Sequence, residues 1–285
     1  MSGDLNSKIY KILSEAGDEE ARLDSDILAE EFSGSEHAAL LAAQTRASGV
    51  PLAYVTGNKY FWRQKYDVSV GVLIPRSDTE ILVEAALKFC GCNDMATGDV
   101  ASVPSDCSSS SVLFADLCTG SGCVGLSLAS ELVSCGRSVD LKLVDFSSVA
   151  LEYAGINAGK YFPAAEIVSF DVLSGEALPW QGLDFITANP PYIDDADYAA
   201  LSEGVRFYEP AEALKGGADG LSFYPCLCAL GRTALRSGGM LLVEHGYNRG
   251  AAVREIFERA GYTSCVTLRD YGGNERVTCG RFYAG

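Results

Sequence analysis

The feature that most constrains the fold of this chain is an alternation of strand-like and helix-like segments that begins near residue 112. Short apolar runs (VLFADL, LKLVD, AEIVSF, LDFITA and MLLVE) are separated by segments in which apolar residues recur at helical spacing, and two more strands are expected at the end. This alternation is typical of a parallel sheet covered by helices on both faces. We therefore predict an α/β fold with a seven-stranded, mostly parallel sheet.

The first part of the chain has a different pattern. Apolar residues recur at helical spacing over residues 1–50, and the aromatic, partly alternating segment YFWRQKYDVSVGVLIP is typical of a β-hairpin. In SDTEILVEAAL, Ser77 and Glu80 have the spacing of a capping box, which predicts a helix starting near Thr79. These changes predict three regions: an N-terminal helical domain (1–50), a β-hairpin linker (51–73) and a larger domain (74–285).

One segment of the larger domain has a composition of its own. Residues 91–111, GCNDMATGDVASVPSDCSSSS, are small, polar and low in complexity. Such a segment lacks the apolar residues needed to form a packed core. We expect a mobile surface loop that buries little surface.

The composition restricts the class of protein. No apolar run reaches the roughly 18–20 residues of a membrane span, and the N-terminus has no apolar signal core, so a cytoplasmic protein is expected. The net charge of −16 disfavours direct nucleic-acid binding, since phosphate contacts need Lys and Arg. Ten scattered cysteines without a CxxC pair, together with only two histidines, favour free thiols in a reducing compartment over a metal site.

A glycine-rich turn follows the first strand of the alternating region. In ADLCTGSGCVG, the glycines at 120, 122 and 125 fit the pattern G-x-G-x-x-G, and Asp145 ends the next strand 20 residues later. This spacing suits a dinucleotide site, where glycines let the backbone approach the ligand and the acid binds ribose hydroxyls. S-adenosylmethionine needs nearly the same features: a ribose partner, here Asp145, and a partner for the adenine edge, such as Asp171. The glycine pattern alone leaves both ligands open.

Asp116 favours the second ligand. It lies just before the glycines and is better placed beside an ammonium group than beside phosphates. S-adenosylmethionine has no pyrophosphate, so the helix N-terminus would lose its anion-binding role.

The motif TANPPYIDD (187–195) decides between them. It follows the fourth parallel strand, at the carboxyl edge where open α/β sheets bind ligands. The prolines fix their own φ, and Pro190 pushes Asn189 into an extended conformation. The Asn189 side-chain oxygen and the Pro190 carbonyl then form a rigid pair of acceptors that fits a planar –NH2 group, while the Tyr192 ring can pack on the flat substrate. The pattern predicts methyl transfer to an amine by orientation, without a titrating base.

Together the motifs DLCTGSGC, NPPYI, VRFYEP, LIPRSDTE, EHGYNRG and RDYGGNERVTCGR closely resemble the HemK/PrmC family of release-factor glutamine methyltransferases. The resemblance is strong over about residues 51–285. It implies a Rossmann-like class I methyltransferase fold, with the glutamine of the Gly-Gly-Gln tip of a peptide-chain release factor as substrate. The N-terminal helices would grip that partner, and a monomer is expected.

The resemblance also implies site residues. The S-adenosylmethionine site would contain Cys118, Thr119, Gly120, Ser121, Gly122, Asp145, Val172 and Asn189, to which our own reading of the pattern adds Asp171. The glutamine would be held by Asn189, Pro190, Pro191 and Tyr192, of which Asn189, Pro190 and Tyr192 are the expected catalytic groups. Two departures stand out: Ser77 replaces a usual proline, a change expected to keep the helix cap, and Val172 replaces a frequent aromatic residue at the adenine wall.

Three rival functions remain: methylation of an exocyclic amine in DNA or RNA, cofactor binding without chemistry, and an NAD-dependent dehydrogenase. The acidic charge opposes the first, the intact Asn189 opposes the second, and NPPY has no use in the third.

Other residues are weaker candidates for the site. A structural role is expected for Glu244 and His245, and a core position for Phe61 and Trp62. The pair Arg76 and Glu80 is expected either to line the substrate pocket or to brace the domain junction.

Overall fold

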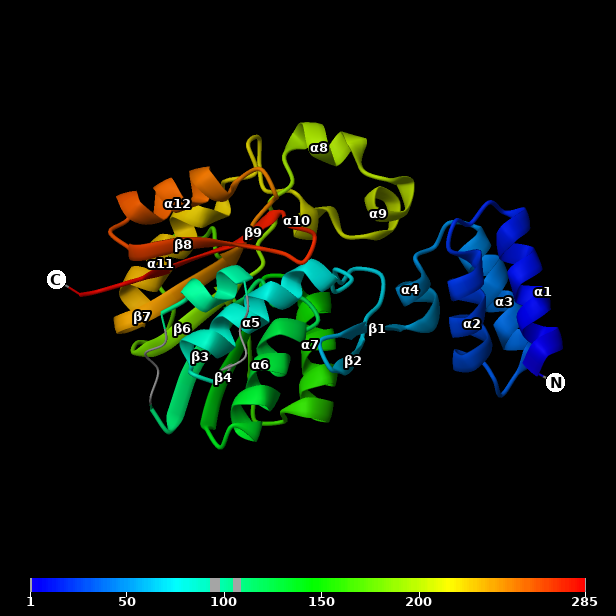
Figure 1. Ribbon diagram of the computed structural model, residues 1–285, viewed down its shortest axis with the longest axis horizontal. Helices are drawn as coiled ribbons and strands as arrows, with labels where there is room; N and C mark the ends of the chain where they lie inside the picture. Colours follow the sequence, from blue (N-terminus) through cyan, green and yellow to red (C-terminus); the bar gives the residue numbers. More distant parts are fainter. Residues whose placement is uncertain (1, 93–97, 105–108, 285) are drawn as a thin grey trace.

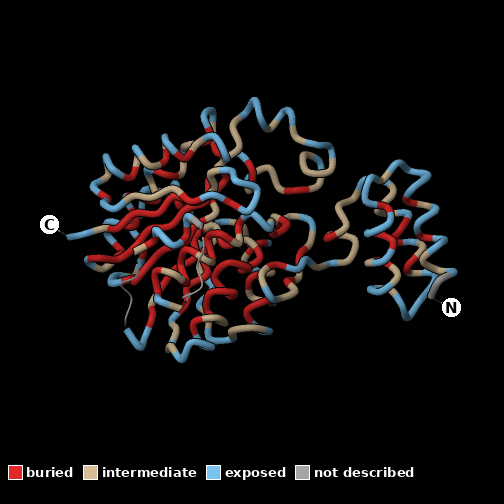
Figure 2. Tube along the Cα trace, in the orientation of Figure 1, coloured by how far each residue is buried: buried red, intermediate tan, exposed pale blue. Residues whose placement is uncertain are grey.

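The computed structural model describes residues 2–92, 98–104 and 109–284. Figure 1 shows a large α/β body and a small helical unit to one side of it, joined by a short hairpin. Figure 2 shows separate buried cores in the two parts. No helix in these ranges combines the length and the apolar character that a membrane span requires.

The helical unit consists of three helices, followed by the short connecting helix α4: α1 (Ser2–Glu15), α2 (Ala21–Glu31), α3 (Glu36–Ala47) and α4 (Leu52–Thr56). Its own core contains Ile9, Leu13 and Leu28, which are fully buried. The helical character predicted for the first 50 residues is therefore confirmed.

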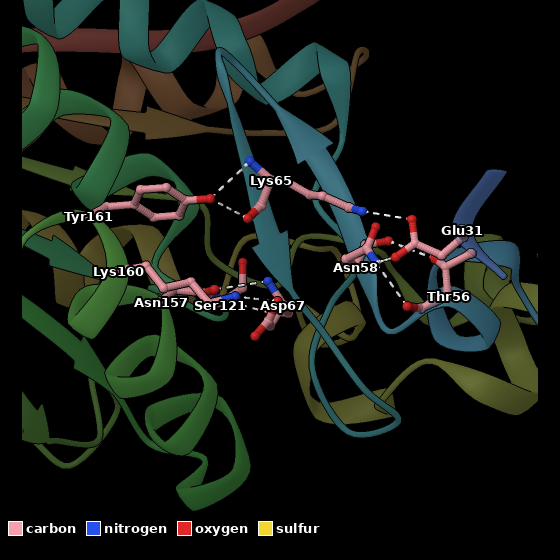
Figure 3. Close-up of polar contacts among 9 residues, drawn as sticks. All are labelled: Glu31, Thr56, Asn58, Lys65, Asp67, Ser121, Asn157, Lys160 and Tyr161. Atoms are coloured by element: carbon pink, nitrogen blue, oxygen red, sulfur yellow. Dashed lines mark hydrogen bonds and ion pairs between the residues drawn. The ribbon is translucent and has the colours of Figure 1, made fainter. Parts of the chain in front are cut away.

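A hairpin is present but is shorter than the predicted linker of residues 51–73: β1 (Asn58–Phe61) pairs antiparallel with β2 (Gln64–Asp67), and residues Leu52–Thr56 before it form α4. Figure 3 shows that polar contacts hold it on both sides. Toward the helical unit, Lys65 Nζ donates to Glu31 Oε2 at 2.7 Å. Toward the large body, Lys65 N donates to the Tyr161 hydroxyl at 3.1 Å and Asp67 N donates to Asn157 Oδ1 at 2.8 Å. The hairpin is thus a bonded junction between the two parts.

The large body contains the predicted seven-stranded sheet in the order β5-β4-β3-β6-β7-β9-β8. The first five strands in this order pair in parallel, and β9 pairs antiparallel with both β7 and β8. The strands are β3 (Ser111–Leu117), β4 (Ser138–Asp145), β5 (Glu166–Ser169), β6 (Leu183–Ala188), β7 (Leu235–Glu244), β8 (Thr263–Arg269) and β9 (Glu275–Arg281).

Helices cover both faces of this sheet, as the alternating pattern predicts. One core packs the sheet against α5 (Glu80–Phe89), α6 (Cys123–Ser134) and α7 (Ser148–Tyr161). The other packs it against α11 (Phe223–Ala234) and α12 (Gly250–Arg259). The connection after β6 contains three short helices: α8 (Asp195–Ala200), α9 (Glu203–Tyr208) and α10 (Ala211–Leu214).

The predicted capping box is wrong. Residues Ser77–Thr79 form a 3-10 turn, η1, and α5 begins at Glu80 without a side-chain cap. The Glu80 carboxylate instead accepts a hydrogen bond from the backbone N of Trp62 at 2.8 Å. A contact from the hairpin has therefore replaced the local cap.

The low-complexity segment at 91–111 lies partly outside the described residues, which exclude 93–97 and 105–108. Its described part contains a 3-10 turn, η2 (Gly98–Ser102). Val100 and Val103 are 3% and 2% exposed and belong to the core on the α5 face. The expectation that the whole segment buries little surface is wrong at these two positions, because they anchor it to the core.

Candidate active site

A cavity of about 550 Å³ opens at the carboxyl ends of the parallel strands. Most of the predicted cofactor residues line it: Cys118, Thr119, Gly120, Ser121, Asp145, Asp171, Val172 and Asn189. Gly122, the residue just before α6, does not line the cavity. Of the predicted substrate residues, Pro191 lines this cavity, whereas Pro190 and Tyr192 line a second one.

The glycine turn has the backbone conformation that its sequence requires. Gly120 and Gly122 have φ of +57° and +82°, a left-handed region that side chains rarely adopt. A Cβ at Gly120 would meet nothing within 4 Å, so the turn presents bare backbone to the cavity. Gly125 has another role, since a Cβ there would lie 2.5 Å from Leu143 Cδ2. The third glycine of the motif therefore permits close packing of α6 on the sheet.

Asp145 ends β4 and supports the glycine turn. Its Oδ2 accepts from the backbone N of Gly120 at 2.9 Å, and its Oδ1 accepts from that of Ser147 at 2.9 Å. Burial raises the pKa of Asp145, while these two hydrogen bonds oppose the rise. The carboxyl group thus holds the turn in place and borders the cavity.

Asp116 joins three elements beneath the turn. Its carboxyl oxygens accept from Thr119 Oγ1 at 2.6 Å, from Thr187 Oγ1 at 2.7 Å and from the backbone N of Gly125 at 3.1 Å. Burial raises its pKa to about 6. Asp116 lines the cavity, but these contacts give it a bracing role, and contact with a ligand ammonium stays a prediction.

Aromatic residues beside Val172 were missed in the sequence. Phe146 and Phe170 both line the large cavity, and Phe146 is 69% exposed although it is large and apolar. They supply aromatic surface near Val172, while Asp171 Oδ1 accepts from the backbone N of Leu173 at 2.8 Å. Their position in the sequence could have indicated this role, because each phenylalanine directly follows the last residue of a parallel strand.

Asn189 lies where the two cavities meet. The second cavity, of about 290 Å³, shares with the first a wall formed by Leu73, Arg76, Asn189 and Ala213. The Asn189 Nδ2 atom donates to Thr79 Oγ1 at 3.3 Å. One side chain is therefore accessible from both cavities.

The NPPY loop is held tightly from behind. The Tyr192 hydroxyl donates to Glu244 Oε1 at 3.1 Å, and burial raises the pKa of this tyrosine. Two glycines that sequence reasoning passed over make room for the loop: a Cβ at Gly216 would lie 2.6 Å from Tyr192 Cα, and one at Gly220 would lie 2.4 Å from Tyr192 O. The glycine-rich segment GGADG at 216–220 could have indicated this close approach, because no predicted helix or strand explained its glycines.

Arg76 and Glu80 have separated roles. Arg76 lines both cavities and forms an ion pair with Glu209, which is 5% exposed and also accepts from Ile74 N at 3.2 Å. Glu80 braces the hairpin through Trp62. Arg76 therefore lines the cavities, whereas Glu80 braces the junction with the hairpin.

The remaining candidates are structural. His245 is fully buried and bonds to Gly246 O and Thr278 Oγ1, both at 3.0 Å. Phe61 lies in the core, and Trp62 packs against it while its ring N–H donates to Glu131 at 2.8 Å. Within the described ranges, no group of three or more His, Cys, Asp or Glu could hold a metal, and the cysteines are free thiols.

Comparison with known proteins agrees with this geometry. Residues 102–217 match the methyltransferase small domain family. The chain is 40% identical over 239 residues to the release factor glutamine methyltransferase of Salmonella typhimurium, covering 84% of this chain and 78% of that protein. It is 35% identical over 286 residues to the enzyme of the same name from Geobacter sulfurreducens, covering 94% and 92%.

A solved structure shares the fold. The hMettl16 catalytic domain, in complex with the MAT2A 3′UTR hairpin 6, superposes with a TM-score of 0.55 at 14% identity over 85% of this chain and 82% of that one. Fold and site together define a class I methyltransferase, an enzyme whose cofactor is S-adenosylmethionine. Within that class, the chain belongs to the release factor glutamine methyltransferase family.

Proposed function

We propose that this enzyme transfers a methyl group from S-adenosylmethionine to the side-chain amide nitrogen of a glutamine, in the Gly-Gly-Gln motif of a peptide-chain release factor. The names of the relatives support this substrate. The single observation that carries the proposal is the position of Asn189 in the wall common to both cavities. A side chain there can contact a cofactor in one cavity and an amide in the other.

The large cavity fits S-adenosylmethionine. Its volume of about 550 Å³ lies within the ordinary range for small-molecule sites. The bare backbone at Gly120 permits close approach, Asp145 offers an acceptor to the ribose, and Phe146 and Val172 offer apolar walls for the adenine. When bound, this cofactor supplies a methyl group activated by a positively charged sulfur.

The smaller cavity fits the amide of a glutamine. The Asn189 Oδ1 atom and the Pro190 carbonyl provide two acceptors for the two N–H hydrogens, and the prolines keep that pair rigid. Holding both hydrogens orients the nitrogen lone pair and favours the pyramidal nitrogen of the transition state. The apolar residues Leu201, Val205 and Leu214 line the same cavity and limit access of water. As the S–CH3 bond breaks and the N–CH3 bond forms, the amide becomes cationic and then releases one N–H proton to water, so the mechanism needs no proton-accepting side chain at the nitrogen.

The three regions of the chain have separate proposed tasks. Residues 74–285 perform the chemistry, residues 51–73 join the parts, and residues 1–50 dock the protein substrate. The enzyme would act as a monomer in the cytoplasm, where it would meet release factors. A nucleic-acid substrate is disfavoured by the net charge of −16, because binding to phosphates depends on positive charge.

The direct test is mass spectrometry of purified release factors after incubation with the enzyme and isotope-labelled cofactor. We expect one added methyl group, located on the Gly-Gly-Gln glutamine. Methylation of RNA or DNA under the same conditions, with unmodified release factor, would contradict the proposal.

A second experiment tests the division of tasks. A chain starting at Pro51 should still bind cofactor, since all the proposed cofactor residues, including Asp116, lie well after residue 51. It should lose most of its activity on intact release factor and much less on a short Gly-Gly-Gln peptide. Equal losses on both substrates would argue against a docking role for residues 1–50.

A further inference from the structure

A buried carboxyl group lies directly behind the NPPY loop. Glu244, the last residue of β7, is 1% exposed. Its Oε1 accepts from the Tyr192 hydroxyl at 3.1 Å, and its main-chain oxygen accepts from the Tyr224 hydroxyl at 3.1 Å. No Lys or Arg forms a salt bridge with it among the described residues. A carboxyl group this buried is costly unless it makes specific hydrogen bonds.

Thr79 lies between this carboxyl group and Asn189. The threonine is 2% exposed, and its hydroxyl accepts the Asn189 Nδ2 hydrogen bond. The same hydroxyl acts as a hydrogen-bonding neighbour of the Glu244 carboxyl, although Oε2 has no partner at full hydrogen-bond geometry among the described residues. The Thr79 hydroxyl is therefore the neighbouring donor for a buried carboxyl oxygen that has no other partner among the described residues. The four side chains form a line in the order Asn189, Thr79, Glu244 and Tyr192.

The direction of hydrogen bonds along this line depends on the charge of Glu244. A carboxylate only accepts, so a Thr79 hydroxyl that donates to it can only accept from Asn189. Asn189 must then present Nδ2 to Thr79 and turn Oδ1 away, toward the cavities. A protonated Glu244 would free the Thr79 hydrogen to donate to Oδ1, and the amide could rotate. Its NH2 group would then face the NH2 group of the substrate, with no acceptor between them.

We infer that Glu244 and Thr79 are positioning residues that set the orientation of the Asn189 amide, so that its oxygen faces the substrate nitrogen. This inference rests on the proposed function, because only an amine substrate requires an acceptor at this place. Asn189 and Tyr192, at the two ends of the line, are the proposed substrate-binding side chains, and the Glu244 carboxylate fixes the orientation of both.

The arrangement makes activity dependent on pH. Burial raises the pKa of Glu244 to about 7, and nearby Arg276 opposes the rise. Other titratable groups face this carboxyl or lie close to it: Tyr192, Tyr224, Cys123, Asp78 and Arg276. Burial raises the pKa values of both tyrosines and of the thiol, so these three groups stay neutral near neutral pH, and the arginine forms ion pairs with Asp78 and Asp270.

The direction of the pH dependence is set by the ionised form of Glu244, which is the active one. Glu244 is ionised above a pH of about 7, so the methylation rate should rise as the pH increases through that value. Asp116, at the cofactor cavity, has a pKa of about 6 and titrates nearby. Measurements at saturating cofactor separate the two groups, because Asp116 acts on the cofactor side.

The test uses the full chain, saturating S-adenosylmethionine and a Gly-Gly-Gln peptide in single-turnover reactions at pH 8. Thr79→Val should lower the rate about 10–100-fold, the scale of a misoriented catalytic group, with unchanged cofactor affinity. Thr79→Ser keeps the hydroxyl and should recover most of that loss. Thr233→Val, on the exposed side of α11, is the matched control and should have no effect. A Thr79→Val rate equal to wild type would overturn the inference.

The pH profile is the second readout. Wild-type activity should rise through a pH of about 7, whereas Glu244→Gln should be low and flat over the same range. Infrared difference spectra should show a protonated carboxyl band that appears in the wild type as the pH falls through 7 and is missing in Glu244→Gln. If that variant does not fold, the wild-type pH profile and the comparison of Thr79→Val with Thr79→Ser still test the inference. A wild-type profile without this rise would overturn the inference.

A double-mutant cycle completes the test. If Thr79 acts only through Asn189, Thr79→Val should add little to the loss caused by Asn189→Ala. Fully additive losses would contradict the relay. A wild-type enzyme that leaves glutamine unmodified at every pH would instead overturn the proposed function, so the two failures are distinguishable.

Discussion

The glycine turn at 118–122 and the NPPY loop at 189–192 lie at the same edge of the sheet but form their sites by opposite means. The turn offers bare backbone, made possible by left-handed glycines and held from beneath by Asp116 and Asp145. The loop offers side chains and a carbonyl, made rigid by prolines and held from behind by Thr79 and Glu244. Damage to the first should weaken cofactor affinity, whereas damage to the second should lower the rate of methyl transfer.

The largest effect is expected at Asn189. Asn189→Ala removes one of two acceptors and leaves a substrate N–H unpaired, so kcat should fall by about 10²–10³. Cofactor affinity should change much less. Single-turnover methylation and a separate cofactor titration measure the two quantities. A wild-type rate would show that the rigid loop is only a turn.

The next largest effect is expected at Asp145, which supports the glycine turn. Asp145→Ala removes the acceptor proposed for the ribose and the support of Gly120, so cofactor binding should weaken by about 1.5–3 kcal/mol. The rate at saturating cofactor should fall much less. Calorimetry with S-adenosylmethionine and with NAD makes the measurement, and tighter binding of NAD to the wild type would contradict the assigned cofactor.

A smaller effect separates two glycines of the same motif. Gly125→Ala places a Cβ 2.5 Å from Leu143 Cδ2, so the free energy of unfolding should fall by about 1–2 kcal/mol. Gly120→Ala meets open space but must keep a φ of +57°, so it should cost about 1–2 kcal/mol of stability and also weaken cofactor binding, which Gly125→Ala should change much less. Denaturant unfolding and calorimetry of both variants provide the comparison. The same response from both would mean that their roles are not distinct.

The smallest effect is expected at Ser77, two residues before Thr79. Ser77 opens the 3-10 turn without capping it, and Arg76 before it is extended, with φ of −107° and ψ of 141°, as a residue preceding proline prefers. Ser77→Pro should therefore stabilise the protein by about 0.4–1 kcal/mol through the unfolded chain. Thermal unfolding measures it, and a lower Tm would show that the Ser77 N–H or hydroxyl has an unrecognised partner.

The sequence by itself determined the sheet, its helices and the identity of both motifs. Strand and helix patterns repeat every two to four residues, and the glycines and prolines act on the backbone where they stand. For this reason the strands, the helical N-terminal unit and the hairpin were predictable. The glycine turn and the NPPY loop could be located for the same reason.

Only the tertiary structure decided what surrounds those motifs. Thr79 meets Asn189 across 110 positions, and Tyr192 meets Glu244 across 52. Glu80 bonds to the backbone of Trp62 instead of forming the predicted cap, because the hairpin places a partly buried donor beside it. Such contacts arise when separate elements pack together and each buried polar group needs a partner, a condition that no local pattern in the sequence records.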